Sequence, residues 1–182
     1  GGKVDVADPS VAVKLGIGFV PSERATEGMV PMLPISENIS LANLDSVVGS
    51  LGLNRAKETG LARRWIERLN IRAPGPEAPI RSLSGGNQQK VVIAKWLNAR
   101  SRILILDHPT RGVDVGAKHE VFSLIRDLCE EGFAILLLAD TLAETIGLSH
   151  RVMVMRDGRM QAEIAAPADN KPSQTRIVEH MV

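Results

Sequence analysis

Residues 83–90, with the sequence Leu-Ser-Gly-Gly-Asn-Gln-Gln-Lys, carry residue types suited to holding an anion. They lead into residues 90–98, whose apolar run and strong helix formers predict a helix. A helix N-terminus presents unpaired backbone N–H groups and the positive end of the helix dipole, and glycine lets a phosphate approach the backbone closely. Ser84, Gly85 and Gly86 are therefore candidate phosphate ligands. The alternative is an ordinary serine cap that follows a glycine turn.

Two further apolar runs each end in a carboxylate. Residues 103–106 lead into Asp107, and residues 134–139 lead into Asp140. Continuous branched apolar runs of this length predict strands covered on both faces, as in parallel α/β sheets, where ligands bind at the carboxyl ends of strands. Residues 117–131, between the two runs, have the apolar spacing of a helix that Gly132 closes. A right-handed strand, helix, strand crossover would bring both carboxylates to one edge of a sheet.

Weaker patterns predict the remaining elements, which must position these residues. In chain order they are a strand at 16–21, a polar loop at 22–28, a capped helix start at 36–41, an amphipathic helix at 55–70, a proline-interrupted linker at 72–81, a hairpin of 151–156 and 159–164 with its turn at Asp157-Gly158, a loop at 167–172 and a short helix at 173–181.

The bulk composition excludes several classes of protein. The chain has 182 residues, 44% of them hydrophobic and 24% charged, which is typical of a globular domain with one core. Lys plus Arg number 22 against 21 Asp plus Glu, and aromatic residues make up 3% without any tyrosine, so we expect no nucleic-acid partner. No apolar run reaches the roughly 18 residues of a membrane span, and we expect no signal peptide.

Together these segments resemble the ATP-binding cassette of ABC transporters. Residues 83–90 are similar to its signature motif, residues 103–107 to its Walker B strand, and residues 112–114 (Gly-Val-Asp) to its D-loop. Asn-Gln-Gln-Lys at 87–90 and Pro-Thr-Arg-Gly-Val-Asp-Val-Gly-Ala-Lys at 109–118 are most similar to the second cassette of bacterial importers for ribose, xylose, arabinose and galactose. The likeness extends from about residue 12 to about residue 164.

The resemblance implies an α/β fold of the P-loop NTPase type, with a mostly parallel sheet flanked by helices and an incomplete N-terminal part. Residues 1–182 would form the C-terminal portion of one cassette. Within it we expect a helical signature subregion at 35–100, a core with Walker B, D-loop and switch at 101–165, and a tail at 166–182.

The resemblance also assigns roles. In the family, two cassettes face each other, and the signature motif of one closes on the ATP γ-phosphate held by the Walker A loop of the other. The residues that would contact ATP or signal across this interface are Ser84, Gly85, Gly86, Asn87, Gln88, Asp114 and Ser22. Asp107 would hold Mg²⁺ through water.

Four features depart from the family pattern. The sequence contains no Gly-x-x-x-x-Gly-Lys-Ser/Thr, the Walker A motif, which we attribute to truncation upstream. The chain alone is therefore expected not to bind ATP tightly and to be inactive. His108 replaces the Glu that polarises the attacking water, Asp140 replaces a His that contacts the γ-phosphate, and Ser22 replaces a Gln near the metal and the membrane subunits.

The replacements at the catalytic strand ends permit two interpretations. Imidazole has a pKa of about 6.5 and can serve as a general base, so His108 and Asp140 could form a reversed catalytic dyad. Aspartate facing a γ-phosphate adds repulsion, however, which favours a degenerate hydrolytic site.

The leading hypothesis is therefore an ATPase component of a monosaccharide importer that uses ATP and Mg²⁺ in the complete assembly. Its partners would be a second cassette, the transmembrane permease and, indirectly, a periplasmic sugar-binding protein, at the cytoplasmic face of the inner membrane. The alternative is a non-hydrolytic regulatory or scaffold half. The sequence disfavours a chromosome-maintenance or repair ATPase, which would insert a long coiled coil before the signature motif, because residues 22–83 contain no sustained heptads.

Overall fold

The computed structural model describes residues 4–50 and 52–181. The chain divides into two units, Gly1–Leu136 and Leu137–Val182, which are taken in turn below. The boundary falls inside strand β5 (Ala134–Leu138). The outer limits predicted for the cassette, residues 1 and 182, lie outside the described residues.

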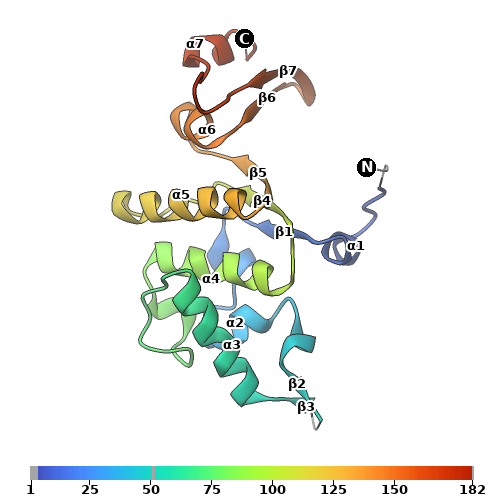
Figure 1. The fold of residues 1–182 in the computed structure, drawn as a ribbon, viewed down its shortest axis with the longest axis vertical. Helices are drawn as coiled ribbons and strands as arrows, with labels where there is room; N and C mark the ends of the chain where they lie inside the picture. Colours follow the sequence, from blue (N-terminus) through green and yellow to red (C-terminus); the bar gives the residue numbers. More distant parts are fainter. Residues whose placement is uncertain (1–3, 51, 182) are drawn as a thin grey trace. The chain divides into compact units, whose positions relative to one another are not determined.

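The sheet of the first unit has the strand order β1-β4-β5 (Figure 1). β1 (Ile17–Val20) pairs in parallel with β4 (Ile103–Asp107), so that Val20 lies beside Leu106. β5 is the neighbour of β4, and α5 (Val115–Glu130) comes between them in the sequence. The predicted strands at 16–21, 103–107 and 134–139 are thereby confirmed to within a residue or two.

The prediction that these strands are covered on both faces is wrong for this chain. Leu104 and Leu106 are fully buried, whereas Ile103 is 40% exposed and Phe19 on the neighbouring strand is 44% exposed. β5 contains no buried residue. Helix α4 (Gly85–Asn98) packs against β1, and burial alternates along β1 and β4, so the cover lies on one face. An apolar run identifies a strand but does not reveal how many of its faces are packed.

Three helices build the core of the first unit around α4. α4 packs against α2 (Ile35–Ser40) and α5, and α3 (Arg55–Arg68) packs against α2 (Figure 1). α3 confirms the predicted amphipathic helix, and the Asn54 side chain caps it by accepting from the Lys57 N–H at 3.0 Å. The buried apolar side chains that these helices share are Ile35, Ile39, Ala62, Val91, Val92, Ile93, Leu97, Val121, Leu124, Ile125 and Leu128.

Helix α4 begins at Gly85, five residues before the predicted start. Ser84 has extended backbone angles and is the N-cap, so the two glycines belong to the first turn of the helix. Helix α5 begins at Val115, two residues before its predicted start, because the Asp114 carboxylate accepts from the Ala117 N–H at 2.9 Å. Gly132 follows α5 with φ +86°, as its predicted role in ending the helix requires.

The predicted cap of α2 is wrong. Ser36 lies inside the helix, and the N-cap is Pro34, which offers no side-chain acceptor. Carbonyl groups of the proline-rich linker take over this task, since Ala78 accepts from the Ile35 N–H and Pro76 from the Ser36 N–H, both at 2.9 Å. The linker at 72–81 therefore holds the start of α2 as well as leading to residue 84.

Several short elements of the first unit were not expected. Residues 24–28 form a π-helical turn, η1 (Arg24–Gly28), where a loop was predicted. The other unexpected elements are α1 (Pro9–Lys14), η2 (Leu44–Val47), the antiparallel pair β2 (Val48–Gly49) and β3 (Gly52–Leu53), and η3 (Ile80–Ser82).

The second unit is built on the predicted hairpin of β6 (Arg151–Arg156) and β7 (Arg159–Ala165). Asp157 and Gly158 have φ +50° and +73°, the left-handed angles of a type I′ turn. An unpredicted helix, α6 (Leu142–Leu148), and the short α7 (Gln174–Val178), which confirms a helix within 173–181, complete the unit. Its buried apolar cluster is Val152, Val154, Ile164, Ala166 and Ile177.

None of the helices that the structure describes, in either unit, is both long and apolar enough to cross a bilayer.

Candidate functional site

The start of α4 is an open helix N-terminus. The Ser84 side chain accepts no hydrogen bond from the helix backbone; its Oγ instead accepts from Asn87 Nδ2 at 2.8 Å. The first-turn N–H groups of an α-helix have no partner within the helix. The N–H groups of Gly85 and Gly86 are therefore available to an anion, as the sequence predicts for a phosphate.

Close packing explains the two glycines. A Cβ at Gly85 would lie 2.6 Å from Arg24 Nη2 and 2.9 Å from the Gly112 carbonyl oxygen. A Cβ at Gly86 would lie 2.6 Å from the Ala117 Cβ on α5. These distances are shorter than contacts between real side chains, so both positions demand glycine whether or not a ligand is present.

Asn87 and Gln88 brace this turn from within. Gln88 Nε2 donates to the Leu83 carbonyl at 2.9 Å, and Asn87 Oδ1 accepts from the Arg72 N–H at 2.9 Å. Their predicted contact with ATP stays a prediction; what these hydrogen bonds do in the described chain is fix the turn on either side of Ser84.

Arg24 joins this turn to the segment that follows β4, and sequence reasoning did not single it out. Its Nη1 donates to the Arg111 carbonyl at 2.7 Å, its Nη2 to the Gly112 carbonyl at 3.3 Å, and its Nε to Gln88 Oε1 at 3.4 Å. Burial lowers the pKa of the guanidinium from its ordinary value, yet arginine remains charged. Two of the acceptors are backbone carbonyls, which leave no signature in a sequence.

The predicted metal and catalytic residues of the first unit lie at the carboxyl end of the sheet. Asp107 is the last residue of β4, and Ser22 comes two residues after Val20, which ends the neighbouring parallel strand. His108 has φ +47°, and its Nδ1 lies 2.6 Å from Asp107 Oδ1. The imidazole is thus hydrogen-bonded to the carboxylate that is predicted to hold Mg²⁺.

Asp140 belongs to the second unit, where it follows β5 and precedes α6. Its pairing with His108 stays a prediction. Across residues 4–50 and 52–181, no three His, Cys, Asp or Glu side chains gather closely enough to form a metal site of their own.

Asp114, the predicted D-loop residue, is exposed, and it caps α5 through the bond to Ala117 described above. Val113 before it is buried, so the backbone enters α5 in a fixed direction. Because Gly86 packs on Ala117, the D-loop and the start of α4 form one packed arrangement.

Lys90 on α4 forms a second contact with α5, through Glu120. Its side chain is 5% exposed, and its ammonium group donates to Glu120 Oε2 at 2.8 Å and to the Asn70 carbonyl at 2.9 Å. The hydrogen bond from Lys90 is the main reason that the pKa of Glu120 lies below its ordinary value, and the charges of Lys90 and Arg72 add to the effect.

This lowered pKa predicts an acid-sensitive contribution to stability. A depressed folded-state pKa stabilises the fold above the ordinary carboxyl pKa of about 4.3, and this stabilisation is lost as the pH falls through the lower folded value. Glu120→Gln should therefore be less stable than the wild type near neutrality and should lose less stability on acidification. Urea unfolding followed by tryptophan fluorescence, near neutral pH and below the ordinary carboxyl pKa, would measure both free energies of unfolding. Glu130→Gln, at an exposed position, is the control. Equal acid sensitivity of Glu120→Gln and the wild type would contradict the prediction.

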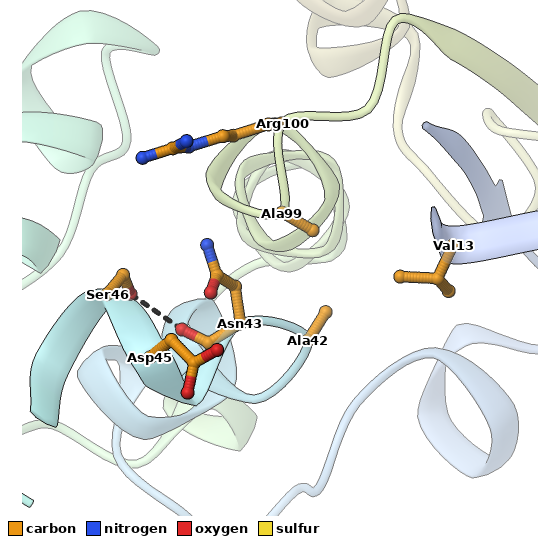
Figure 2. Close-up of a pocket in the computed structure, with 7 residues that line it drawn as sticks. All are labelled: Val13, Ala42, Asn43, Asp45, Ser46, Ala99 and Arg100. Atoms are coloured by element: carbon orange, nitrogen blue, oxygen red, sulfur yellow. Dashed lines mark hydrogen bonds between the residues drawn. The ribbon is translucent and has the colours of Figure 1, made fainter. Parts of the chain in front are cut away.

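A cavity of about 370 Å³ lies elsewhere in the first unit (Figure 2). Within it, Ser46 Oγ donates to the Asn43 carbonyl at 2.6 Å, and Asn43 Nδ2 donates to the Asn98 carbonyl at 2.9 Å. Its lining residues are Val13, Ala42, Asn43, Asp45, Ser46, Ala99 and Arg100. None of the predicted site residues is among them, so this cavity is not the predicted site.

Comparison with known proteins agrees with this geometry. The family model described as "ABC transporter" matches residues 3–111, which is more than half of the chain. The chain belongs to the ABC transporter family. Ribose import ATP-binding protein RbsA of Burkholderia mallei is 44% identical over 169 residues, and that of Bacillus subtilis is 43% identical over 178 residues. These matches cover 92% and 98% of this chain but 33% and 36% of the relatives, so the chain spans about one third of their length.

Solved structures of ABC proteins share the fold. The ATP-binding cassette MJ0796, in a dimeric post-hydrolysis state bound to ADP and Pi, has a TM-score of 0.70 and 21% identity over 88% of this chain and 68% of that one. The cassette MJ1267 has a TM-score of 0.75 and 20% identity over 96% and 71%. The predicted resemblance and the predicted ABC cassette fold are confirmed.

Proposed function

We propose that this chain is part of the ATP-binding component of a ribose-type sugar importer, in which it supplies the signature motif and the D-loop to an ATP site shared with a second cassette. The observation that carries the proposal is the uncapped start of α4, built from two glycines and packed against the D-loop. The names of the relatives support the transported class, since the proteins from both organisms are ribose import ATP-binding proteins.

The donor groups suit a magnesium nucleotide. The N–H groups at the start of α4 would bind phosphate oxygens, and Asp107 would hold Mg²⁺, which in proteins commonly takes one or two carboxylates with phosphates and water as its other ligands. When bound, the cation would neutralise charge on the phosphate oxygens. The side chain of Asp107 is 27% exposed, so it can be reached from solvent.

The hydrogen bond between His108 and Asp107 favours a second possibility for the chain's own hydrolytic site. His108 stands where the family has the Glu that polarises the attacking water, and its Nδ1 lies 2.6 Å from the Asp107 carboxylate that would hold Mg²⁺. Asp140, where the family has a His, would add repulsion to a γ-phosphate. We therefore propose that this site is degenerate, with the reversed His108 and Asp140 dyad as the alternative. A non-hydrolytic regulatory or scaffold half is the corresponding alternative for the whole chain.

The test uses the complete importer ATPase that contains this chain. Ser84→Arg places a long cation over the start of α4 and should lower ATPase activity by about 100-fold, the scale for losing transition-state stabilisation of this kind. His108→Ala should change the activity little. Ser123→Arg, at an exposed position of α5, is the matched control and should leave it unchanged.

The three variants separate the interpretations. If only Ser84→Arg loses ATPase activity, the result supports a chain whose signature motif completes the ATP site of the second cassette. Loss with His108→Ala as well would contradict the degenerate site, and loss with neither would leave the scaffold half as the better account.

The partners follow from the same proposal. A second cassette and a transmembrane permease would hold this chain at the cytoplasmic face of the inner membrane, with a periplasmic sugar-binding protein acting only through the permease. Co-purification of the complete ATPase with its permease from detergent-solubilised membranes would test this arrangement.

A further inference from the structure

Arg24 lies where three separate segments of the first unit meet. It begins the π-helical turn η1 after β1, and its guanidinium contacts the carbonyls of Arg111 and Gly112 and the side chain of Gln88. Guanidinium is planar and presents its donors in a fixed fork, so one side chain can hold acceptors from several segments at once. π-Helical turns are rare and occur often at functional sites.

The other end of η1 is also anchored to α4. Lys95 Nζ donates to the Gly28 carbonyl at 2.6 Å, and Lys95 is 8% exposed. η1 is therefore held to α4 at both ends, by Gln88 near the helix start and by Lys95 two turns later. A movement of η1 must be transmitted to α4 or must break one of these bonds.

The position of the guanidinium against α4 is equally restricted. Arg24 Nη2 occupies the space in which a Cβ of residue 85 would stand, and the Gly112 carbonyl borders the same space. Beside it, Arg111 Nη1 lies 3.2 Å from the Glu23 carboxylate, which adds a second link between the segments after β1 and β4. The turn at 111–112 leads directly to Asp114, the cap of α5.

We propose that Arg24 is a positioning residue, which holds the turn at 111–112, and through it Asp114, in register with the start of α4. Arg24 itself contacts no nucleotide in this role. Its consequence for activity rests on the proposed function above, whereas the local coupling of the three segments does not. Through Arg24, the segment after β1 contacts both the start of α4 and the turn at 111–112 that precedes Asp114.

Lysine cannot replace this arginine fully. An ammonium group is a compact charge without the planar fork, so it cannot reproduce the arrangement in which three guanidinium nitrogens each face a separate acceptor. The comparison of Arg24→Lys with Arg24→Ala therefore separates retention of the charge from retention of the geometry.

Hydrogen exchange in the complete ATPase tests the local coupling. In Arg24→Ala, which removes all three hydrogen bonds, amides of residues 84–88 and 109–117 should exchange at least about tenfold faster, the scale of a single charge-assisted hydrogen bond, and Arg24→Lys should be intermediate. Amides of α3 should not change, nor should any amide in the control Arg63→Ala, an exposed arginine of α3. Unchanged exchange at 109–117, or an equal increase throughout α3, would overturn the proposal.

Steady-state ATPase kinetics of the same variants test the consequence. Arg24→Ala should lower kcat about tenfold with little change in KM, because alignment of the D-loop and the signature motif matters most in the transition state. Arg24→Lys should recover part of kcat. A rise in KM with kcat unchanged would show that Arg24 supports binding and would overturn the positioning role. A wild-type protein without ATPase activity would refute the proposed function, and the exchange result would still decide the coupling.

Discussion

Alanine at position 86 is expected to force α4 and α5 apart and to lower the free energy of unfolding by about 1–3 kcal/mol, the usual cost of overpacking. The new Cβ would stand 2.6 Å from the Ala117 Cβ. Each of these carbon atoms is attached directly to a helix backbone, so no side-chain rotation can relieve the clash. One helix must move, and either movement displaces the start of α4 relative to Asp114.

The same displacement should lower ATPase activity of the complete protein by about 100-fold, since misplacement by about 1 Å can cost that much. Urea unfolding followed by tryptophan fluorescence measures the stability, because Trp65 and Trp96 both lie in the first unit. Gly60→Ala is the matched control: a Cβ there meets no atom within 4 Å, and alanine inside α3 should stabilise the protein by about 0.5–1 kcal/mol.

A double variant identifies the clash as the cause. Gly86→Ala combined with Ala117→Gly removes the opposing Cβ and should restore activity, with a favourable coupling energy in the double-mutant cycle. If the double variant has no more activity than Gly86→Ala alone, the clash between the Cβ atoms of residues 86 and 117 is not the cause of the lost activity.

At α4, the sequence predicts the kind of site but not the residue at which the helix begins. The order of residues in 83–90 predicts an anion site at a helix start. Local propensity predicts the helix start at residue 90, because glycines lower helix propensity and normally lie outside helices. Tertiary contacts override this preference: Arg24 and Ala117 occupy the space that side chains at 85 and 86 would need. Such contacts cannot be seen in a local window of sequence.

Two missed helices did have sequence signals. Asp8 accepts from the Ser10 and Val11 N–H groups, and Pro9 begins α1, which is the pattern of an acidic cap with proline at the first helical position. Thr141 accepts from the Glu144 N–H at 3.2 Å, and Thr-x-x-Glu is the sequence of a capping box. Attention to caps as well as to apolar periodicity would have predicted both.

The long-range polar contacts had no such signal. Arg24 and Lys95 donate to backbone carbonyls that are 67 or more residues away in the sequence, and a carbonyl is present at every position of a chain. The sequence also does not reveal which face of the sheet is packed, since Ile103 and Leu104 are both apolar but differ in burial. Elements and motifs followed from local pattern, while the links that assemble the site followed from the fold.

Asn38→Ala is expected to lower the free energy of unfolding by about 3 kcal/mol, on the scale for a buried hydrogen-bond network that is broken. Asn38 is 2% exposed, and its Oδ1 accepts from the Val30 N–H at 2.8 Å. Its Nδ2 lies within hydrogen-bond distance of the carbonyls of Val30, Leu33 and Pro34, at 3.1, 3.2 and 3.0 Å. Alanine would leave the buried Val30 N–H without its side-chain acceptor. The three carbonyls would lose the amide donor and keep only their backbone hydrogen bonds, from the Leu33, Ile80 and Asn38 N–H groups.

The loss should extend to the path between η1 and α2. Residues 30–34 also accept backbone hydrogen bonds from the linker, where Leu33 receives the Ile80 N–H and Pro31 receives the Arg81 N–H. Urea unfolding should therefore report a lower midpoint for Asn38→Ala, and hydrogen exchange should quicken at 30–34 and 78–82 together. Asn170→Ala, at an exposed asparagine of the second unit, is the control and should be near neutral. If both variants cost the same, the hydrogen bonds of Asn38 contribute no more than an exposed amide does, and the linker is held by its own backbone contacts.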